Sequence, residues 1–394
     1  MRAAVSNMTW GGWFSLTSAA ATAVVVGFAS TILVIMQAAQ AVGATPSQQA
    51  SWAAVLCFGM ALTTFYLCWQ HRMPIITAWS TPGAALIATS AAGVDYPHAL
   101  GTFVAAGLLM ALTALVKPLA VAIAEIPTPI ASAMLAGVLL HYTLGIPAAA
   151  LAMPFYVLPL VVVFFGLRLS YPLFAVPVVV ALGVALAAFA GGFAGKCCAV
   201  GVTQLEWTMP QFDMAAILSL GVPLYLVTMA SQNLPGFAVM RAAGYEPPVA
   251  SCLLVTGLGS VALAPFGSHA VNLAAITASL VTGPDAHPDK DRRWLVAFPY
   301  SILYVAVGFA AAVFVAVLGA LPKELITTIA GLALFSPLMG SAIVMLKEPR
   351  DVESAMITFL VTASGITFEG VGAAFWGLVA GLLLFLVRHL VVKN

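Results

Sequence analysis

Charged side chains are scarce in this sequence, and their scarcity excludes most soluble proteins. Lys, Arg, Asp and Glu make up 7% of its 394 residues, whereas 62% of the residues are hydrophobic. Soluble domains usually carry about 25% charged residues. We therefore expect a polytopic membrane protein whose main neighbour is the lipid bilayer. The formal net charge is only +1. Because nucleic-acid binding needs a clustered basic face, we expect no nucleic acid as a partner.

Motifs for metal binding and catalysis are also missing. The five cysteines are Cys57, Cys68, Cys197, Cys198 and Cys252, and their spacing fits no zinc or haem pattern. No apolar run contains paired acidic residues or a His-Glu metal motif. We expect no metal site, no cofactor and no enzymatic activity, and we assign no chemistry to the adjacent pair of cysteines.

Long hydrophobic runs, in contrast, follow one another along the chain. A membrane-spanning helix needs about 20 apolar residues. Counting such runs, with shorter ones where a span is broken, predicts an all-α protein with fourteen transmembrane spans. The expected limits are 14–41, 48–70, 73–91, 97–117, 127–145, 150–168, 171–193, 213–238, 248–263, 264–282, 294–318, 322–345, 353–367 and 370–391. Residues 1–12 contain one Arg and no compact apolar run, so we expect no removable signal peptide.

The basic residues predict how the spans are oriented. If the N-terminus is cytoplasmic, all 14 Lys and Arg residues except Lys196 and Lys323 fall on the cytoplasmic side. Basic residues favour cytoplasmic loops, so we expect both termini to be cytoplasmic. The polar loop 194–212 is then external. The charged loop Gly283–Trp294 is cytoplasmic and typical of a solvated turn, with a gating role as the alternative.

The second half of the chain repeats the first. Residues 50–59 match 250–259 at an offset of 200, and Pro74–Leu86 then matches Pro265–Thr277 at an offset of 191. Seven spans precede the second copy. Because seven is odd, the two copies lie in opposite orientations and form an inverted repeat.

Spans 3 and 10 are predicted to be broken, since Pro and Gly interrupt both. We expect each to consist of a short extended piece, 74–79 or 265–270, followed by a half-helix that starts at Thr81 or Asn272, whose side chain caps it. Irregular backbone inside lipid must be buried in protein or line a cavity, so the two pieces should pair with each other or face a central cavity. Two helix N-termini facing one gap from opposite sides form an anion site without Lys or Arg.

Candidate binding residues lie on the broken spans and on spans 1 and 8. Ser231, Gln232 and Asn233 form a polar cluster in mid-bilayer, which is costly unless it serves packing or binding. Hydrogen bonds between helices, or back to the same helix, are the alternative. We predict that the substrate is bound by Ser30, Thr31, Trp79, Ser80, Thr81, Pro82, Gly83, Ser231, Gln232, Asn233, Ser268, His269, Ala270 and Asn272. Trp79, Phe28 and Phe266 are candidates for an aromatic wall.

His269 is the predicted proton-coupling residue, with a structural histidine as the alternative. Its reference pKa is about 6.5, so it is the only side chain in this set that can change charge near neutral pH. Two positive helix ends and poor solvation favour the neutral imidazole in an empty site, whereas a bound carboxylate favours the imidazolium. By linkage, the proton then favours the carboxylate to the same degree.

Several longer motifs resemble the benzoate/proton symporter (BenE) family of bacterial inner membranes. They are Thr77–Leu86, Leu226–Gly236, Pro265–Thr277, Ala286–Trp294, Phe359–Gly365 and Ala374–Gly377. The resemblance extends over nearly the whole chain. It implies an inner-membrane location and the seven-plus-seven inverted-repeat fold of uracil permease and related carriers, with the site between spans 3 and 10.

The resemblance also implies a division into a transport core and a gate that often dimerises. The core is expected at 14–118 and 213–318, the gate at 119–193 and 319–394, and an external linker at 194–212. Uracil-permease-like carriers place acidic residues in spans 8 and 10, where this chain has Gln232 and His269. That departure fits an anionic substrate better than a neutral nucleobase.

The expected function is therefore the import of benzoate, or a similar small aromatic carboxylate, together with a proton. A membrane potential that is negative inside opposes the entry of a lone anion by about 2.3 kcal/mol per charge per 100 mV, and one proton removes that opposition. The alternatives are a carrier of a nucleobase or another organic anion on the same fold, and an anion channel.

Overall fold

The first half of the computed structural model consists of helices and one short strand. The structure describes residues 8–91, 93–116, 127–189, 201–369 and 371–391, so Cys197, Cys198 and part of the predicted linker lie outside the described residues. The elements are α2 (Trp10–Ala41), α3 (Pro46–His71), β1 (Thr77–Trp79), α4 (Thr81–Ser90), α5 (Tyr96–Leu115), α7 (Thr128–Ala152), α8 (Pro154–Ser170), η1 (Pro172–Phe174) and α9 (Ala175–Phe189).

The second half has the same plan with more interruptions. Its elements are α10 (Met214–Ala216), η2 (Ile217–Gly221), α11 (Val222–Thr228), η3 (Met229–Asn233), α12 (Leu234–Ala242), α13 (Val249–Leu263), η4 (Ala264–Phe266), β2 (Val271–Leu273), α14 (Ile276–Thr282), η5 (Lys290–Val296), α15 (Ala297–Phe309), α16 (Ala311–Gly319), α17 (Lys323–Met345), α18 (Val352–Ser364) and α19 (Ala373–Val391). We call α7, α8, α9, α17, α18 and α19 the gate helices, and the remaining elements the core elements.

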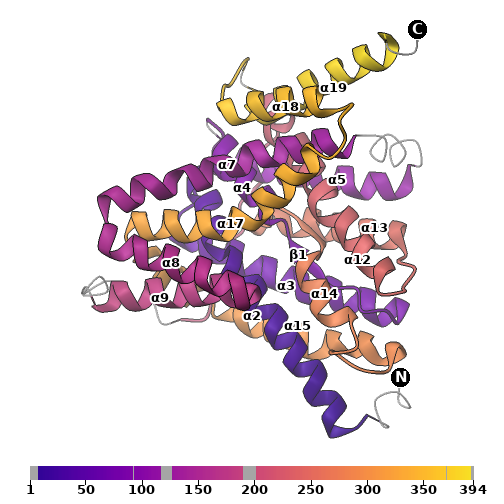
Figure 1. Ribbon diagram of the computed structural model, residues 1–394. Coiled ribbons are helices and arrows are strands. Elements are labelled where there is room, and N and C mark those ends of the chain that lie inside the picture. The colour runs from indigo at the N-terminus through magenta and orange to yellow at the C-terminus, as the bar shows by residue number, and fades with distance from the viewer. Residues whose placement is uncertain (1–7, 92, 117–126, 190–200, 370, 392–394) are drawn as a thin grey trace.

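The protein is mostly helical and polytopic. In the described part of the chain, eight helices are long and apolar enough to cross a membrane, or nine if the bent pair Lys290–Phe309 and Ala311–Gly319 is one span. Helical elements occupy each range in which a span was expected. Figure 1 shows the gate helices running across the view, with the start of α2 and the end of α19 both toward the right.

The predicted breaks in spans 3 and 10 are confirmed. β1 and β2 pair as a two-stranded antiparallel sheet, with Thr77 opposite Leu273, Ala78 opposite Asn272 and Trp79 opposite Val271. Outside these pairs, the Ser80 N–H donates to the Ala270 carbonyl at 3.3 Å and the Ala274 N–H to the Ile76 carbonyl at 2.9 Å. The two extended pieces thus satisfy each other's backbone groups within the membrane protein.

The register predicted for the second copy is wrong. The half-helices start at Thr81 and Ile276, an offset of 195 rather than 191. Pro265 does not open the extended piece, because it lies in the 3-10 turn η4 that follows α13. The chain turns instead at Gly267, whose φ is 111° and whose position leaves no room for a Cβ beside Trp52. Asn272 is consequently in the middle of β2, and its predicted role as a helix cap is incorrect.

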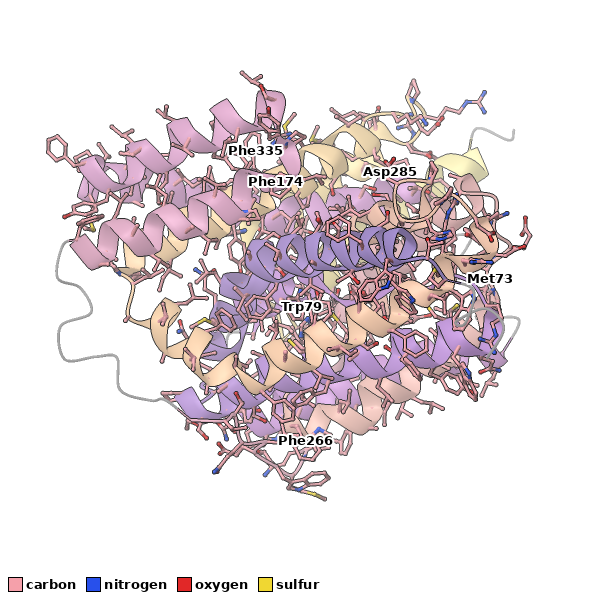
Figure 2. All side chains as sticks on the ribbon, turned by 90° about the horizontal axis from the view of Figure 1, so that it is seen from below. Met73, Trp79, Phe174, Phe266, Asp285 and Phe335 are labelled. Carbon is pink, nitrogen blue, oxygen red and sulfur yellow. The ribbon has the colours of Figure 1, made fainter. Side chains whose placement is uncertain are left out.

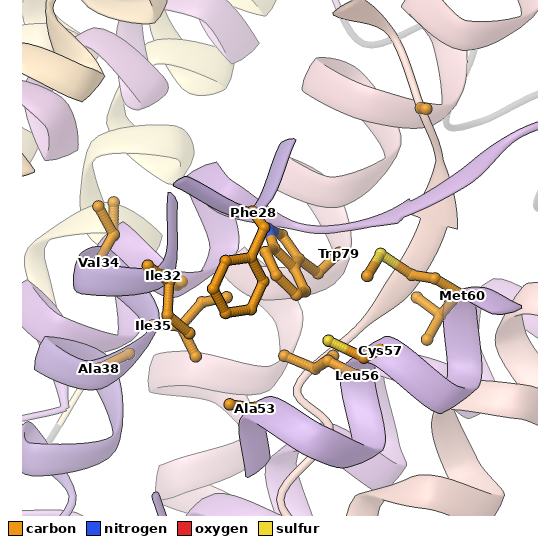
Figure 3. Close-up of a cluster of buried hydrophobic side chains, with 14 of the residues drawn as sticks. Phe28, Ile32, Val34, Ile35, Ala38, Ala53, Leu56, Cys57, Met60 and Trp79 are labelled. Carbon is orange, nitrogen blue, oxygen red and sulfur yellow. The ribbon is translucent and has the colours of Figure 1, made fainter. Parts of the chain in front are cut away.

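Packing around β1 explains why the strand stays in place. The Thr77 hydroxyl lies 2.7 Å from that of Thr63 and 2.8 Å from that of Thr64, and the Tyr300 hydroxyl donates to the Thr77 carbonyl at 2.8 Å. Figure 3 shows the adjacent apolar core, in which the Phe28 ring of α2 lies beside the Trp79 indole, with residues of α3 on the other side. Polar groups bonded in pairs and apolar side chains together fix the strand.

The described part of the predicted linker is packed on the core elements. The Thr203 hydroxyl donates to the Phe309 carbonyl at 3.0 Å and accepts from the Ala312 N–H at 2.8 Å, so it bridges the break between α15 and α16. Farther along, the Thr208 N–H donates to the Pro265 carbonyl and the Gln211 N–H to the Pro97 carbonyl, both at 2.9 Å. This segment satisfies backbone groups that broken helices leave open.

Candidate substrate-binding site

A cavity of about 640 Å³ lies between the core elements and the gate helices. Its volume falls within the range of about 300–1,000 Å³ that is usual for small-molecule sites. The core side comes from the middle of α2, from β1 and the start of α4, from η3, and from the start of α14. The gate side comes from the first turns of α7 and α9 and from the second half of α17. The breaks in spans 3 and 10 therefore open directly onto a cavity.

The structure brings half of the predicted binding residues to this cavity. The lining includes Ser30, Thr31, Trp79, Thr81, Pro82, Ser231 and Gln232. The described lining does not include Ser80, Gly83, Asn233, Ser268, His269, Ala270 or Asn272. Most of the second group come from the copy in which the predicted register was wrong, and they are buried away from the cavity.

Aromatic side chains form one wall of the cavity. The Trp79 indole N–H donates to the Thr31 hydroxyl at 2.6 Å, and its ring centroid lies 5.9 Å from that of Phe28 and 6.3 Å from that of Tyr304. Phe266 does not belong to this wall. It packs on Trp207 at 5.2 Å, and Figure 2 shows it at the edge of the molecule, away from Trp79 in the interior. Tyr304, which sequence reasoning missed, takes that place.

Three cavity hydroxyls bond back to their own helices. Ser30 donates to the Val26 carbonyl at 2.5 Å, Thr31 to the Gly27 carbonyl at 2.7 Å, and Ser231 to the Val227 carbonyl at 2.5 Å. A hydroxyl has a single hydrogen to donate. In this arrangement the three side chains therefore offer a ligand lone pairs only.

Other groups at the cavity retain hydrogens to donate. No hydrogen bond joins the Gln232 amide or the Thr81 hydroxyl to another residue in the described part of the chain. Gln232 lies on the π-helical turn η3, and such turns change which side chains face a site. At α4, Ser80 and not Thr81 is the N-cap and accepts from the Gly83 N–H at 3.1 Å. At α14, Ala275 supplies no side-chain cap, so its first amides remain open.

His269 occupies a structural position in this conformation. Its side chain is 0% exposed. Nδ1 accepts from the Trp52 indole N–H at 3.1 Å, and Nε2 lies 2.9 Å from the Ser80 carbonyl oxygen. An indole can only donate, so Nδ1 carries no hydrogen and Nε2–H donates to Ser80. The imidazole is therefore neutral and has no free nitrogen for a second proton.

Two buried amide side chains bond to the backbone of the strand pair. The Asn233 carboxamide oxygen accepts from the Leu273 N–H at 3.0 Å. The Asn272 amide, oriented by its neighbours, donates to the Ala78 carbonyl at 3.0 Å and accepts from the Ser80 N–H at 3.2 Å. Both side chains are 0% exposed. Their polar groups serve the backbone and do not face the cavity.

The gate side of the cavity was not predicted at all. It carries hydroxyls from Thr128 and Ser132 of α7 and from Ser336 and Ser341 of α17. Pro337 lies inside α17 and lacks an N–H, so the Ala333 carbonyl loses its usual partner, and both residues line the cavity. A proline between serines in a gate span is a signal that the sequence contains. The broken spans are not the only location of such a signal in the sequence.

Comparisons with known proteins identify the family. The family profile BenE, described as "Benzoate membrane transport protein", matches residues 14–387. The chain belongs to the benzoate membrane transport protein family. This confirms the resemblance of its motifs, and it makes the chain a membrane transporter.

Two curated relatives cover almost the whole chain. "Inner membrane protein YdcO" of Escherichia coli (strain K12) is 38% identical over 374 residues, which are 94% of this chain and 95% of that protein. "Benzoate membrane transport protein" of Acinetobacter baylyi is 30% identical over 373 residues, 95% of each chain.

Solved structures with the same fold are anion transporters by title. The transmembrane domain of the cyanobacterial bicarbonate transporter BicA has a TM-score of 0.62 at 16% identity and covers 95% of this chain and 98% of its own. Murine Slc26a9, an anion transporter in the inward-facing state, has a TM-score of 0.62 at 13% identity and covers 97% of this chain and 69% of its own. At these identities the likeness concerns the fold alone.

Proposed function

We propose that this protein imports benzoate, or a similar small aromatic carboxylate, with a proton across the bacterial inner membrane. One observation carries the proposal. In a family of benzoate transporters, the cavity between core and gate combines an aromatic wall with uncharged hydrogen-bonding groups, and its described lining contains no Asp, Glu, Lys, Arg or His. Such a cavity suits an aromatic ring that carries one small polar group.

The proposed topology is that of fourteen spans in two inverted repeats of seven, with both termini cytoplasmic. The core and gate then have the boundaries 14–118 with 213–318 and 119–193 with 319–394. In this orientation the gate residues of the cavity, apart from Ala333 at the middle of α17, come from the cytoplasmic halves of their helices, which supports an opening toward the cytoplasm. A homodimer through the gate helices is part of the proposal, and the exposed apolar residues Phe155, Leu158, Val162, Phe165 and Leu169 of α8 can face either a partner or lipid.

We propose that the substrate binds with its ring against Trp79 and Tyr304 and its carboxyl group between Gln232, Thr81 and the start of α14. A carboxylate at the membrane midplane costs about 2.5–3.5 kcal/mol on insertion scales. A helix end returns about 0.3–1 kcal/mol, and at best about 2 kcal/mol. The seven-residue α14 cannot compensate alone, so the side-chain donors are needed as well.

The proton is proposed to travel on the carboxyl group itself. A carboxylate only accepts hydrogen bonds, whereas a carboxylic acid accepts and donates. The cavity offers both kinds of partner, with donors at Gln232 and Thr81 and lone pairs at Ser30, Thr31 and Ser231. Protonation also removes the cost of burying a charge. This assignment replaces the sequence-based hypothesis that His269 carries the proton.

Uptake of labelled benzoate into proteoliposomes tests the function. An inward proton gradient is expected to drive accumulation above that of protein-free liposomes, which are essential because neutral benzoic acid crosses lipid by itself. Unlabelled benzoate should compete in counterflow, and uracil should not. Competition by uracil would favour a nucleobase carrier, while currents without uphill accumulation would identify an anion channel.

The substitution His269→Gln tests where the proton travels. A glutamine amide can accept from Trp52 and donate to Ser80 as the imidazole does, so we expect proton-driven accumulation within about twofold of the unmodified carrier. His269→Ala removes both bonds and should reduce thermal stability. A His269→Gln carrier that exchanges benzoate but no longer accumulates it would restore His269 as the proton carrier.

A further inference from the structure

Arg293 is a buried cation at the far end of the half-helix α14. Its side chain is 8% exposed. Nη1 donates to the Thr282 carbonyl at 2.8 Å, Nε to the His287 carbonyl at 2.8 Å, and Nη2 to the Pro288 carbonyl at 3.5 Å. Thr282 is the last residue of α14. These three acceptors are backbone carbonyls, and in the described part of the chain no ion pair joins Arg293 to a carboxylate.

These contacts have a clear electrostatic basis. The last carbonyls of a helix have no partners within it and carry a partial negative charge. The guanidinium supplies the opposite charge and a planar fork of five N–H groups, which can reach several carbonyls at once. A lysine ammonium is a point charge on a flexible stem and cannot reproduce this geometry.

The loop around Arg293 is folded. The expectation of a solvated turn holds for Pro284, Asp285 and 288–291, which are exposed, but not for the buried Ala286, His287, Arg293 and Trp294. His287 is buried, and its Nδ1 accepts from the Asp289 N–H at 3.1 Å. The Ser15 hydroxyl of α2 donates to the Asp285 carbonyl at 2.7 Å. The Arg72 guanidinium lies 4.2 Å from the centre of the Trp294 ring. The loop is therefore a fixed cap that joins the end of α14 to α2 and α3.

The two ends of α14 have different surroundings. Its start, at Ile276 and Thr277, lines the cavity, and its end is held by Arg293. Seven residues span only about 10 Å at 1.5 Å per residue, so a shift at one end is transmitted to the other. No side chain caps the start of α14. Its placement depends on the strand before it and on the arginine after it.

We propose that Arg293 is a positioning residue that fixes α14 and so sets the affinity of the cavity for its substrate. This inference rests on the proposed function only in taking benzoate as the ligand. Arg293 does not line the cavity, and it acts through α14, whose first residues, Ile276 and Thr277, do. Sites of this kind need their groups held within about 0.5 Å of the productive geometry.

Kinetics of Arg293→Gln and Arg293→Lys test the proposal, with Arg292→Gln as the control. Arg292 lies in the same loop and pairs with Asp289 at 3.0 Å, partly exposed. We expect Arg293→Gln to raise the KM for benzoate about tenfold with a maximal rate within about twofold of the unmodified carrier. Arg293→Lys should give a smaller increase, and Arg292→Gln none. A merely structural arginine would lower the amount of folded carrier without changing KM.

Hydrogen exchange of residues 276–282 supplies a readout that needs no substrate. Exchange should be faster in both Arg293 variants and unchanged in Arg292→Gln. An unchanged KM in folded Arg293→Gln would overturn the proposal, as would a raised KM without faster exchange. If Arg293→Gln fails to fold, the same two measurements on Arg293→Lys decide. If the unmodified carrier shows no saturable benzoate uptake, the proposed function fails, while the exchange data still decide whether Arg293 positions α14.

Discussion

Oxidising a carrier with the paired substitutions Ser90→Cys and Gly372→Cys is expected to stop nearly all benzoate transport. A Cβ built on Gly372 would lie 3.7 Å from the Cβ of Ser90. Disulfides need Cβ atoms about 3.5–4.5 Å apart. Ser90 ends α4 among the core elements, and Gly372 directly precedes the gate helix α19. The crosslink would therefore join core to gate once the Ser219 hydroxyl, 3.3 Å from the added Cβ, shifts by a few tenths of an ångström.

The position of this contact explains the expected loss. Gly372 also donates its N–H to the Ser219 hydroxyl at 2.9 Å, so core and gate are closed together here. The cavity borders the start of α4, and α4 is 10 residues long, so the contact lies at the other end of that helix. Access from that side requires the contact to open. A crosslink holds the carrier in the conformation described here.

Each single substitution provides a control, because neither can form this bond. All variants should be built without the native cysteines. Reduction is expected to restore transport to the level before oxidation. Mass spectrometry measures how much crosslink forms. Continued transport by fully crosslinked protein would mean that core and gate do not separate at this contact.

Removing hydrogen-bond donors from the cavity is expected to weaken benzoate binding strongly. Thr81→Val and Gln232→Leu should each weaken benzoate binding about tenfold, the equivalent of about 1.4 kcal/mol, since each leaves a buried carboxyl oxygen without a partner. The double variant should lose about a hundredfold if the two donors act independently. Calorimetric titration of the purified protein at fixed pH measures both.

Thr81→Ser is the matched control, because it keeps the hydroxyl and removes only a methyl group. Its affinity should stay within about twofold of that of the unmodified protein. Equal affinity for Thr81→Val and Thr81→Ser would show that this hydroxyl does not hold the carboxyl group. Unchanged binding in Gln232→Leu as well would place the carboxyl group elsewhere in the cavity.

The sequence predicted those parts of the site that local chemistry determines. Pro and Gly in mid-span predicted the breaks at β1 and β2, and the need to satisfy backbone groups in lipid predicted that the pieces pair. Polar residues in spans 1 and 8 predicted Thr31 and Gln232 at the cavity. Each of these predictions rests on a residue type, Pro, Gly or a polar residue, that is unfavourable within a membrane span.

Register and side-chain direction could not be predicted in the same way. Pro265 is equally compatible with an extended piece and with the first turn of a 3-10 helix, so the second copy was shifted by four residues. That shift assigned a helix start to Asn272 and a place at the cavity to His269, which the described lining does not include. The inward contacts of His269 depend on Trp52, far away in sequence, and no local pattern reports them.

The pairing of β1 with β2 restricts the cavity-lining residues of β1 to one register. Side chains alternate between the faces of a strand, so a slip by one residue reverses every one of them. Such a slip would break the bonds of Thr77 to Thr64 and of Trp79 to Thr31 at the same time. The two broken spans therefore cannot slide past each other in small steps, and any motion that displaces Trp79 must move β1 and β2 together as one rigid unit.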